Sequence, residues 1–296
     1  MNAALPVLVR DAALAHLRHG PAGRSQPPHP PRPLAVLLHG IGGGREGWAT
    51  TGPALAAAGF TALAVDLPGY GHSPALAEPS IEAFADAVRR LIEAAAQGPA
   101  LVVGHSLGGM VAQALAATAP GSVGALVLAG TSPAFGPGDG AWQREFVAAR
   151  LAPLDAGLGM PGLAARLVPA MAGRDAAPAP LAAAESLMAG VPEATYRAVL
   201  PALARFDRRA ALAAIAVPTL VLAGEDDRTA PPAVGERMAA RIAQAECRVL
   251  PRTGHLLMLE NPMAFDAALI DFVQRRVLPH LRAAHRTEET EDVRRA

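Results

Sequence analysis

A serine within GHSLGG (104–109) has the setting that most plainly suggests chemistry. Ser106 follows a short apolar run and precedes a helical pattern, so its G-x-S-x-G motif falls at a predicted strand-to-helix turn. Such a turn holds the serine in a strained conformation with its hydroxyl projecting, and the small flanking residues avoid clashes. The helix that follows directs its free N–H groups to the place where negative charge would develop. These features predict a nucleophile.

A serine hydroxyl is nearly inert until a base takes its proton, and that base needs an acid to orient it. Two downstream residues fit these roles. Asp227 closes the run PTLVLAGEDD, and His255 closes ECRVLPRTGH. Because the carboxyl ends of parallel strands meet at one edge of a sheet, these distant positions are expected to become neighbours there. The sequence therefore predicts Ser106, His255 and Asp227 as nucleophile, base and orienting acid.

A tetrahedral intermediate also needs two preorganised hydrogen-bond donors for its oxyanion. The backbone N–H of Leu107, directly after the serine, is the first candidate. The second is the N–H of Ile41 in the loop HGIGGG (39–44), whose glycines let the backbone approach a substrate closely. His39 and His105 flank this region and are interpreted as packed or hydrogen-bonded histidines rather than bases.

The elements that position these residues alternate between short apolar runs and helical patterns. A helix is expected from Ser80, which can cap it, another over 107–119, and a third from Asn261-Pro262. This alternation is typical of an α/β fold with a mostly parallel central sheet and helices on both faces. The expected strands are 34–40, 60–71, 100–106, 125–132, 218–227 and 246–255.

The interval 136–216 breaks this rhythm, because it has no convincing strand and many prolines between Ala-, Leu- and Met-rich pieces. We interpret it as an inserted cap of several short helices. The core is then expected in two parts, 1–135 and 217–281, with a proline-rich connection at 21–33. The segment 282–296 has almost no large apolar residue and is predicted to be a disordered tail.

Five motifs in this order resemble the α/β-hydrolase fold family, in its cap-bearing branch of serine hydrolases that includes carboxylesterases and enol-lactonases. They are HGIGGGREGW, DLPGYGHS, GHSLGGMVAQ, GEDDRTAP and GHLLMLENP. GHSLGGMVAQ is similar to 3-oxoadipate enol-lactonases. The resemblance implies the same triad and the same two oxyanion donors. Asp226 is a rival acid, but the family spacing from Gly224 to Pro231 favours Asp227.

Composition narrows the function classes further. Lys+Arg and Asp+Glu both total 26, and every basic residue is an arginine dispersed along the chain, so binding to nucleic acid or a membrane is not expected. The single cysteine, Cys247, excludes an intrachain disulfide and fits a reducing compartment. The N-terminus has no long apolar leader segment, and no run is long enough to span a membrane. We expect a cytoplasmic protein and leave its oligomeric state open.

The sequence thus predicts a serine hydrolase that cleaves small, largely apolar esters or lactones through an acyl-enzyme on Ser106, without a metal or organic cofactor. C–C bond hydrolysis, perhydrolysis and acyl transfer use the same triad and stay open as alternatives. A remote alternative is a dinucleotide-binding protein, because GGGREG (42–47) satisfies G-x-G-x-x-G and Asp66 follows on the next strand.

Overall fold

The computed structural model describes residues 7–11, 14–20, 32–96, 98–136 and 140–281. The predicted tail 282–296 and residues 21–31 of the proline-rich connection lie outside this described part. Among the described helices, none is long and apolar enough to cross a bilayer.

One sheet of eight strands forms the centre of the described structure, in the order β1-β2-β4-β3-β5-β6-β7-β8. From β4 to β8 neighbouring strands pair in parallel, whereas β1 pairs antiparallel with β2, and β2 antiparallel with β4. The mostly parallel sheet is confirmed. The strands are Val7–Asp11 (β1), Leu14–His19 (β2), Leu34–Leu38 (β3), Thr61–Val65 (β4), Ala100–His105 (β5), Val123–Ala129 (β6), Thr219–Gly224 (β7) and Ala245–Leu250 (β8).

The observed strands are shorter at their carboxyl ends than the apolar runs suggested. The largest difference follows β4, which ends at Val65 rather than continuing to residue 71. Gly69 and Gly71 have φ values of 87° and 50°, a left-handed conformation that a strand cannot contain. The residues beyond Val65 therefore form a loop at the edge of the sheet.

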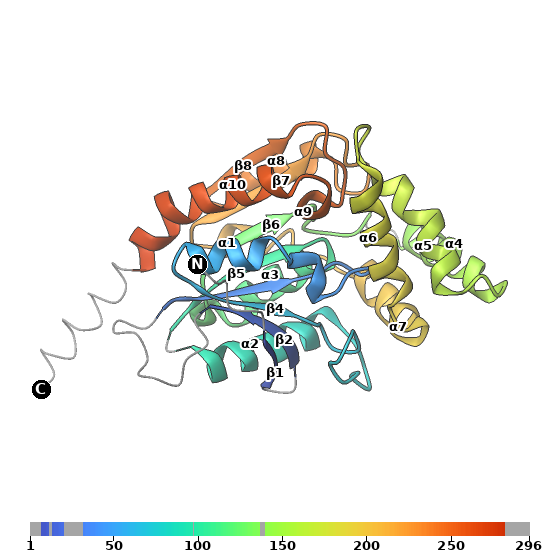
Figure 1. Cartoon of the computed structure of the whole chain (residues 1–296), viewed down its shortest axis with the longest axis horizontal. Helices are drawn as coiled ribbons and strands as arrows, with labels where there is room; N and C mark the ends of the chain where they lie inside the picture. The colour runs from blue at the N-terminus through green and yellow to red at the C-terminus, as the bar shows by residue number, and fades with distance from the viewer. Residues whose placement is uncertain (1–6, 12–13, 21–31, 97, 137–139, 282–296) are drawn as a thin grey trace, which may run out of the picture.

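Alternate side chains of each central strand enter two separate cores. In β3, Val36 and Leu38 belong to the core beneath α2, α3 and α8, whereas Ala35 and Leu37 belong to the core beneath α1 and α10. Figure 1 shows α1 and α10 on one side of the sheet and α2 on the other. Helices thus cover both faces, as predicted. They are Thr51–Ala57 (α1), Ile81–Ala95 (α2), Leu107–Thr118 (α3), Pro232–Ala239 (α8), Leu257–Glu260 (α9) and Pro262–Phe272 (α10).

Two of the expected helix starts have the capping geometry that their residue types suggest. The Ser80 hydroxyl accepts a hydrogen bond from the Ala83 N–H at 3.0 Å, and Asn261 accepts one from Ala264 at 3.3 Å. These bonds satisfy N–H groups that the helices leave without a backbone partner.

Four α-helices follow β6 and precede β7, and the described residues between these strands form no strand. Figure 1 shows them grouped beyond one end of the sheet, at the right of the view. We name them the helical insertion. These helices are short, with 12 to 15 residues each, but the prolines at 153, 169 and 201 lie inside three of them rather than between them. The four helices are Ala141–Asp155 (α4), Gly159–Met171 (α5), Pro178–Ala189 (α6) and Glu193–Ala204 (α7).

Candidate active site

Ser106 stands between β5 and α3 in a backbone conformation that L-residues rarely adopt, with φ 51° and ψ −113°. The turn is so tight that the residues two positions before and two positions after the serine must be glycine. A Cβ atom on Gly104 would lie 2.3 Å from the Gly108 carbonyl oxygen, and one on Gly108 would lie 2.2 Å from that of Leu38. The Ser106 carbonyl accepts a hydrogen bond from the Thr131 hydroxyl at 2.8 Å. The sequence GHSLGG therefore folds into the elbow that its pattern predicts.

The ring of His255 lies in hydrogen-bonding distance of both other residues proposed as a triad. His255 Nε2 lies 3.1 Å from Ser106 Oγ, and His255 Nδ1 lies 2.8 Å from Asp227 Oδ2. A carboxylate only accepts hydrogen bonds, so the Nδ1 proton is directed at Asp227. Nε2 is then free to accept the proton of the serine hydroxyl.

Asp227 is buried, with 3% of its surface exposed, and its charge is stabilised on both oxygens. Burial alone would raise its pKa, but the positive charge that His255 carries when protonated, and the hydrogen bond from its ring, oppose this. The N–H groups of Thr229 and Ala230 also donate to Oδ1 at 2.7 and 2.9 Å. Together these contacts hold the pKa of Asp227 below its ordinary value. The acid is therefore ionised beside the imidazole at neutral pH.

The N–H groups of Ile41 and Leu107 are the predicted oxyanion donors. Ile41 follows β3 in the glycine-rich loop, and Leu107 is the first residue of α3. Neither N–H donates a hydrogen bond to any residue in the described part of the chain. Two unpaired donors near a candidate nucleophile suit an arriving oxyanion, because no existing bond has to break.

The rival carboxylates make other contacts. Asp226 accepts a hydrogen bond from the Arg174 backbone N–H at 2.9 Å and forms an ion pair with the Arg174 guanidinium. Asp66 pairs with Arg45 and accepts the His72 N–H at 3.1 Å, so it fixes the loop after β4. Neither carboxylate contacts His255 through any hydrogen bond among the described residues. The geometry accords with the choice of Asp227.

His39 and His105 use their ring nitrogens in hydrogen bonds. The Leu67 N–H donates to His39 Nε2 at 3.1 Å, so Nδ1 must donate to the Gly40 carbonyl at 2.8 Å. His105 Nε2 donates to the His255 carbonyl at 2.8 Å. Burial lowers the pKa of both rings; for His105, burial and the neighbouring charge of His255 lower it to about 3. Both histidines are thus neutral structural groups at pH 7.

Glu260 is a further site residue that sequence reasoning did not identify. Its carboxylate accepts the N–H groups on both sides of His255, from Gly254 and Leu256, each at 2.9 Å. It also accepts the Gly173 N–H of the helical insertion at 2.7 Å. One carboxylate therefore fixes the backbone that carries His255 and attaches it to the insertion.

A cavity of about 110 Å³ lies beside Ser106 and His255, between the glycine-rich loop and the helical insertion. Most of its lining is apolar. Among the described residues that line it, Arg150 is the one Arg, Lys, Asp or Glu. The apolar side chains include Leu167, Met171, Leu187, Met188, Leu200 and Leu203.

Comparison with known proteins places this geometry in a family. A family model described as alpha/beta hydrolase fold matches residues 33–262. The chain belongs to the alpha/beta hydrolase fold family. This hydrolase is 34% identical over 275 residues to a Variovorax paradoxus protein named for carbamate hydrolysis, covering 88% of this chain and 96% of that one.

Two further relatives of this hydrolase have names that refer to esters or lactones. A pimeloyl-[acyl-carrier protein] methyl ester esterase of Aromatoleum aromaticum is 34% identical, with 82% of this chain and 99% of that one covered. The crystal structure of an enol-lactonase from Burkholderia xenovorans superimposes with a TM-score of 0.77 at 27% identity, covering 88% of this chain and 97% of that one.

The dinucleotide-binding alternative finds no matching geometry. Residues 42–47 run from a loop into a four-residue 3₁₀ helix, Arg45–Trp48, and α1 begins only at Thr51. A pyrophosphate site needs the glycine loop to lead directly into a helix N-terminus. Within the described ranges, no group of three His, Cys, Asp or Glu side chains is arranged to hold a metal ion.

Proposed function

We propose that this hydrolase cleaves carboxylic esters or lactones of small, largely apolar acids through an acyl-enzyme on Ser106. The observation that carries the proposal is the continuous contact from Ser106 Oγ to His255 at 3.1 Å and from His255 to Asp227 at 2.8 Å. The apolar cavity beside Ser106 supports an uncharged acyl group, because an unpaired charge there would lose its hydration. Two of the three relatives described above have names that refer to ester or lactone chemistry.

In the proposed mechanism, His255 removes the proton of Ser106 as Oγ attacks the carbonyl carbon. The N–H groups of Ile41 and Leu107 hold the oxyanion. His255 then gives the proton to the leaving oxygen, and the carbon–oxygen bond of the ester breaks. A water molecule, deprotonated by His255, attacks the acyl-enzyme and releases the acid. Asp227 stabilises the imidazolium formed in both half-reactions. We place this activity in the cytoplasm, as the single cysteine suggests.

A second candidate is the hydrolysis of esters or lactones that carry a free carboxylate, and Arg150 is the observation that favours it. Arg150 lines the cavity and forms no ion pair with a described residue. Its guanidinium lies 5.0 Å from the centre of the Phe146 ring. Comparing a neutral short-chain ester with an analogue that has a terminal acyl carboxylate separates the two. If the analogue is preferred in the wild type and loses that preference in Arg150→Met, the second candidate is favoured.

Labelling by a fluorophosphonate, together with a panel of esters and lactones of increasing acyl length, tests the proposed function. We expect Ser106 to be labelled, and Ser106→Ala to lose both the label and about 10⁴- to 10⁶-fold in kcat. A thermal melt of Ser106→Ala controls for folding. A Ser106→Ala protein that keeps more than a tenth of the wild-type rate contradicts the proposal. C–C hydrolysis, perhydrolysis and acyl transfer require the same serine and are distinguished by substrate.

A further inference from the structure

A second and larger hollow, of about 820 Å³, also opens on Ser106 and His255. The loop after β6, the helix α4 and the helix α8 form its walls. It shares Phe146 and Arg150 with the apolar cavity, so the two hollows meet at the candidate nucleophile. We call this second hollow the basic groove, because of the side chains described next.

Five arginines line the basic groove, and none of the described residues lining it is Asp or Glu. They are Arg150, Arg209, Arg228, Arg237 and Arg241. Arg209 pairs with Asp207, but the other four form no ion pair with any residue that the structure describes. In a chain with a formal net charge of zero, this is a strong local excess of positive charge. It favours an anionic ligand and repels a cationic one.

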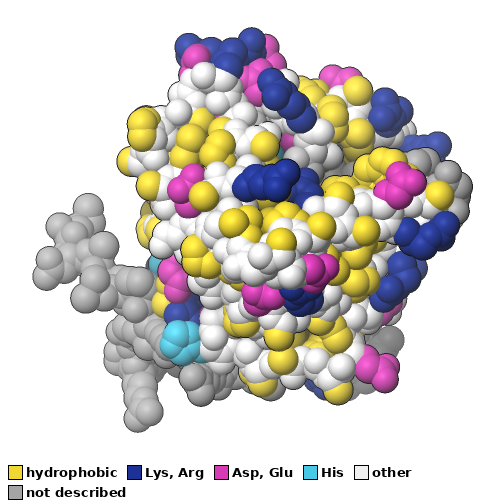
Figure 2. All heavy atoms as spheres, turned by 90° about the vertical axis from the view of Figure 1, so that its right-hand side faces the viewer, with side chains coloured by type: hydrophobic (Ala, Val, Ile, Leu, Met, Phe, Trp, Pro, Cys, Tyr) yellow, Lys and Arg dark blue, Asp and Glu magenta, His cyan; other side chains and the backbone are white. Residues whose placement is uncertain are grey.

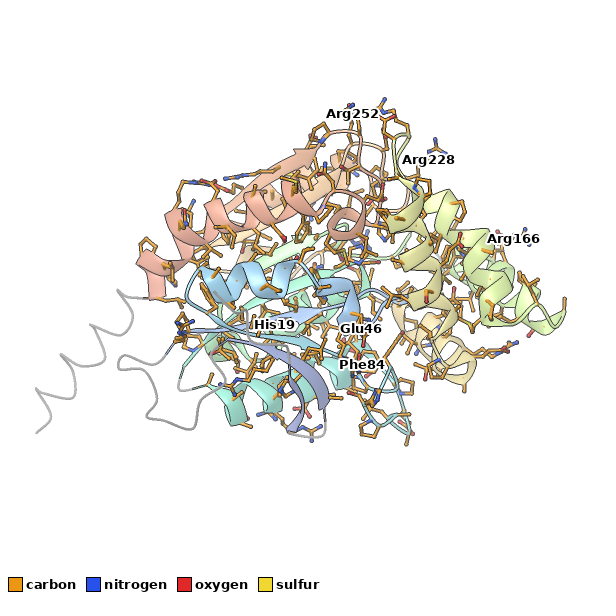
Figure 3. All side chains as sticks on the ribbon, viewed as in Figure 1. His19, Glu46, Phe84, Arg166, Arg228 and Arg252 are labelled. Atoms are coloured by element: carbon orange, nitrogen blue, oxygen red, sulfur yellow. The ribbon has the colours of Figure 1, made fainter. Side chains whose placement is uncertain are left out.

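The arginines come from separate elements of the fold. Figure 3 shows Arg228 beside the upper end of the helical insertion. Arg166, which does not line the groove, lies on the outer side of that insertion. Arg237 lies in α8 and Arg241 just after it, and both are exposed. Figure 2 shows several groups of arginine side chains, in dark blue, on the face of the molecule that carries the insertion. The exposed cations can reach a ligand without first leaving another partner.

An exposed aromatic surface lines the same groove. Trp142 is 41% exposed, which is unusual for so large an apolar side chain. It stacks on Phe146 with 5.3 Å between ring centres, and its ring lies 5.5 Å from that of Phe135. The exposed part of such a ring offers aromatic surface against which a planar base can pack.

We propose that the basic groove binds the leaving group of a thioester whose thiol carries a phosphorylated nucleotide, as in an acyl-coenzyme A. Phosphates pair with the unpaired arginines, and the nucleotide base stacks on Trp142. The acyl chain enters the 110 Å³ cavity, which is too small for such a leaving group, whereas the 820 Å³ groove has room for it. This inference rests on the proposed function, because it assigns a substrate class to the same serine.

The reaction conserves atoms and charge with residues already described. Ser106 Oγ attacks the thioester carbonyl carbon as its proton passes to His255. The carbon–sulfur bond breaks, and the departing sulfur takes that proton as a free thiol. Water then hydrolyses the acyl-enzyme to a carboxylic acid and restores the serine hydroxyl. No oxidant, reductant or metal enters either step.

Three thioesters with the same butyryl group test the proposal. Butyryl-coenzyme A carries the nucleotide and its phosphates, butyryl-4′-phosphopantetheine carries one phosphate and no base, and S-butyryl-N-acetylcysteamine carries neither. We expect kcat/KM to fall in that order. The advantage of butyryl-coenzyme A over the uncharged thioester should shrink as salt increases, because ions screen contacts between exposed charges.

Variants identify which side chains cause the preference. The double variant Arg237→Gln, Arg241→Gln should lower the ratio of kcat/KM between butyryl-coenzyme A and the uncharged thioester roughly three- to tenfold, mainly through KM. Trp142→Leu should lower the ratio between butyryl-coenzyme A and butyryl-4′-phosphopantetheine. Arg166→Gln is the matched control, because Arg166 is exposed, has no ion pair among the described residues and does not line the groove. It should leave both ratios unchanged.

Equal kcat/KM values for the three thioesters, or ratios that the double variant leaves intact, overturn the proposal. A preference for phosphopantetheine without further gain from the nucleotide also overturns it, and indicates a carrier protein as the source of the phosphate. Calorimetric titration of the Ser106→Ala protein with coenzyme A tests the groove without catalysis. If neither esters nor thioesters are cleaved but coenzyme A binds, the proposed function fails and the groove assignment stands. If esters are cleaved but coenzyme A does not bind, only the groove assignment fails.

Discussion

Asp226 and Asp227 are neighbours in the chain, but their carboxylates bind different parts of the molecule. Asp227 accepts a hydrogen bond from the His255 ring, and Asp226 pairs with Arg174 of the helical insertion. Their exposure differs as well, since the Asp226 side chain is 17% exposed and that of Asp227 is fully buried. Two adjacent aspartates therefore have different contacts: Asp227 binds the imidazole of His255, and Asp226 attaches the insertion to the core.

This difference predicts unequal effects of the same substitution. Asp227→Asn should lower kcat about 10⁴-fold, because an amide neither fixes the imidazole tautomer nor stabilises the imidazolium. Asp226→Asn should lower kcat less than tenfold, because it weakens a partly exposed ion pair and a hydrogen bond to Arg174, neither of which contacts His255. Steady-state kinetics on one chromogenic ester measures both. The reverse ranking would show that Asp226 is the acid.

The tight turn at the elbow predicts a large cost for one methyl group. Gly108→Ala places a Cβ atom 2.2 Å from the Leu38 carbonyl oxygen, so the backbone must shift. We expect a loss of about 1–3 kcal/mol in the free energy of unfolding, and a fall in kcat because Ser106 moves with the turn. Gly121→Ala is the control, since no atom lies within 4 Å of its Cβ position. Equal thermal melts for the two variants would contradict this interpretation.

Glu260 is expected to act as a positioning residue. Glu260→Ala leaves the N–H groups of Gly254 and Leu256 without their acceptor, so the backbone that carries His255 loses its support. We predict a fall of about tenfold or more in kcat with little change in KM, and a changed pH profile of kcat. Glu260→Gln keeps one carbonyl acceptor and should recover part of the activity. If both variants are as active as the wild-type protein at every pH, Glu260 has no role in positioning His255.

The buried imidazole of His105 predicts an acid-sensitive stability. Its pKa of about 3 in the folded protein lies below the value of about 6.5 for an exposed histidine. Between these pH values the unfolded chain binds a proton that the folded protein excludes, so stability is lost as the pH falls from about 6.5 toward 3. In this pH range, His105→Gln should reduce the slope of the free energy of unfolding against pH by about 1.4 kcal/mol per pH unit, which corresponds to one proton. Chemical denaturation at several pH values measures it, and an unchanged slope would refute the assignment.

The central strands and the order of the chemical residues could be read from the sequence because each depends on a local pattern. Apolar runs closed by glycine or a polar residue predicted the strands from β3 to β8. The hairpin of β1 and β2 was not predicted. The position of β2 in the sheet depends on antiparallel pairing with β4, and the residues of β2 carry no local pattern that indicates this contact. Glu260 was missed for a similar reason, since its partners are backbone N–H groups, which leave no sequence signal.

The arginines show the limit of linear patterns more clearly. Along the chain they are dispersed, which suggested no concentration of charge. In the folded structure, arginines from α4, from the segment after α7 and from the region of α8 line one groove. Positions that are about 90 residues apart become neighbours because the insertion lies above the ends of the strands. The cavity, the groove and their charges are properties of the tertiary structure alone.

The His255 backbone N–H donates to the carbonyl of Met171, at the end of α5, at 2.8 Å. A Cβ atom on Gly254 would lie 2.4 Å from both that carbonyl and the Gly173 N–H, so the two segments touch without space for a side chain. An exchange of the whole insertion for that of another hydrolase would therefore also replace contacts made by the backbone of His255. Here the donor segment would have to retain residues 171–173 of the recipient, because a graft that replaced them would change the support of His255, the proposed base, together with the lining of the apolar cavity.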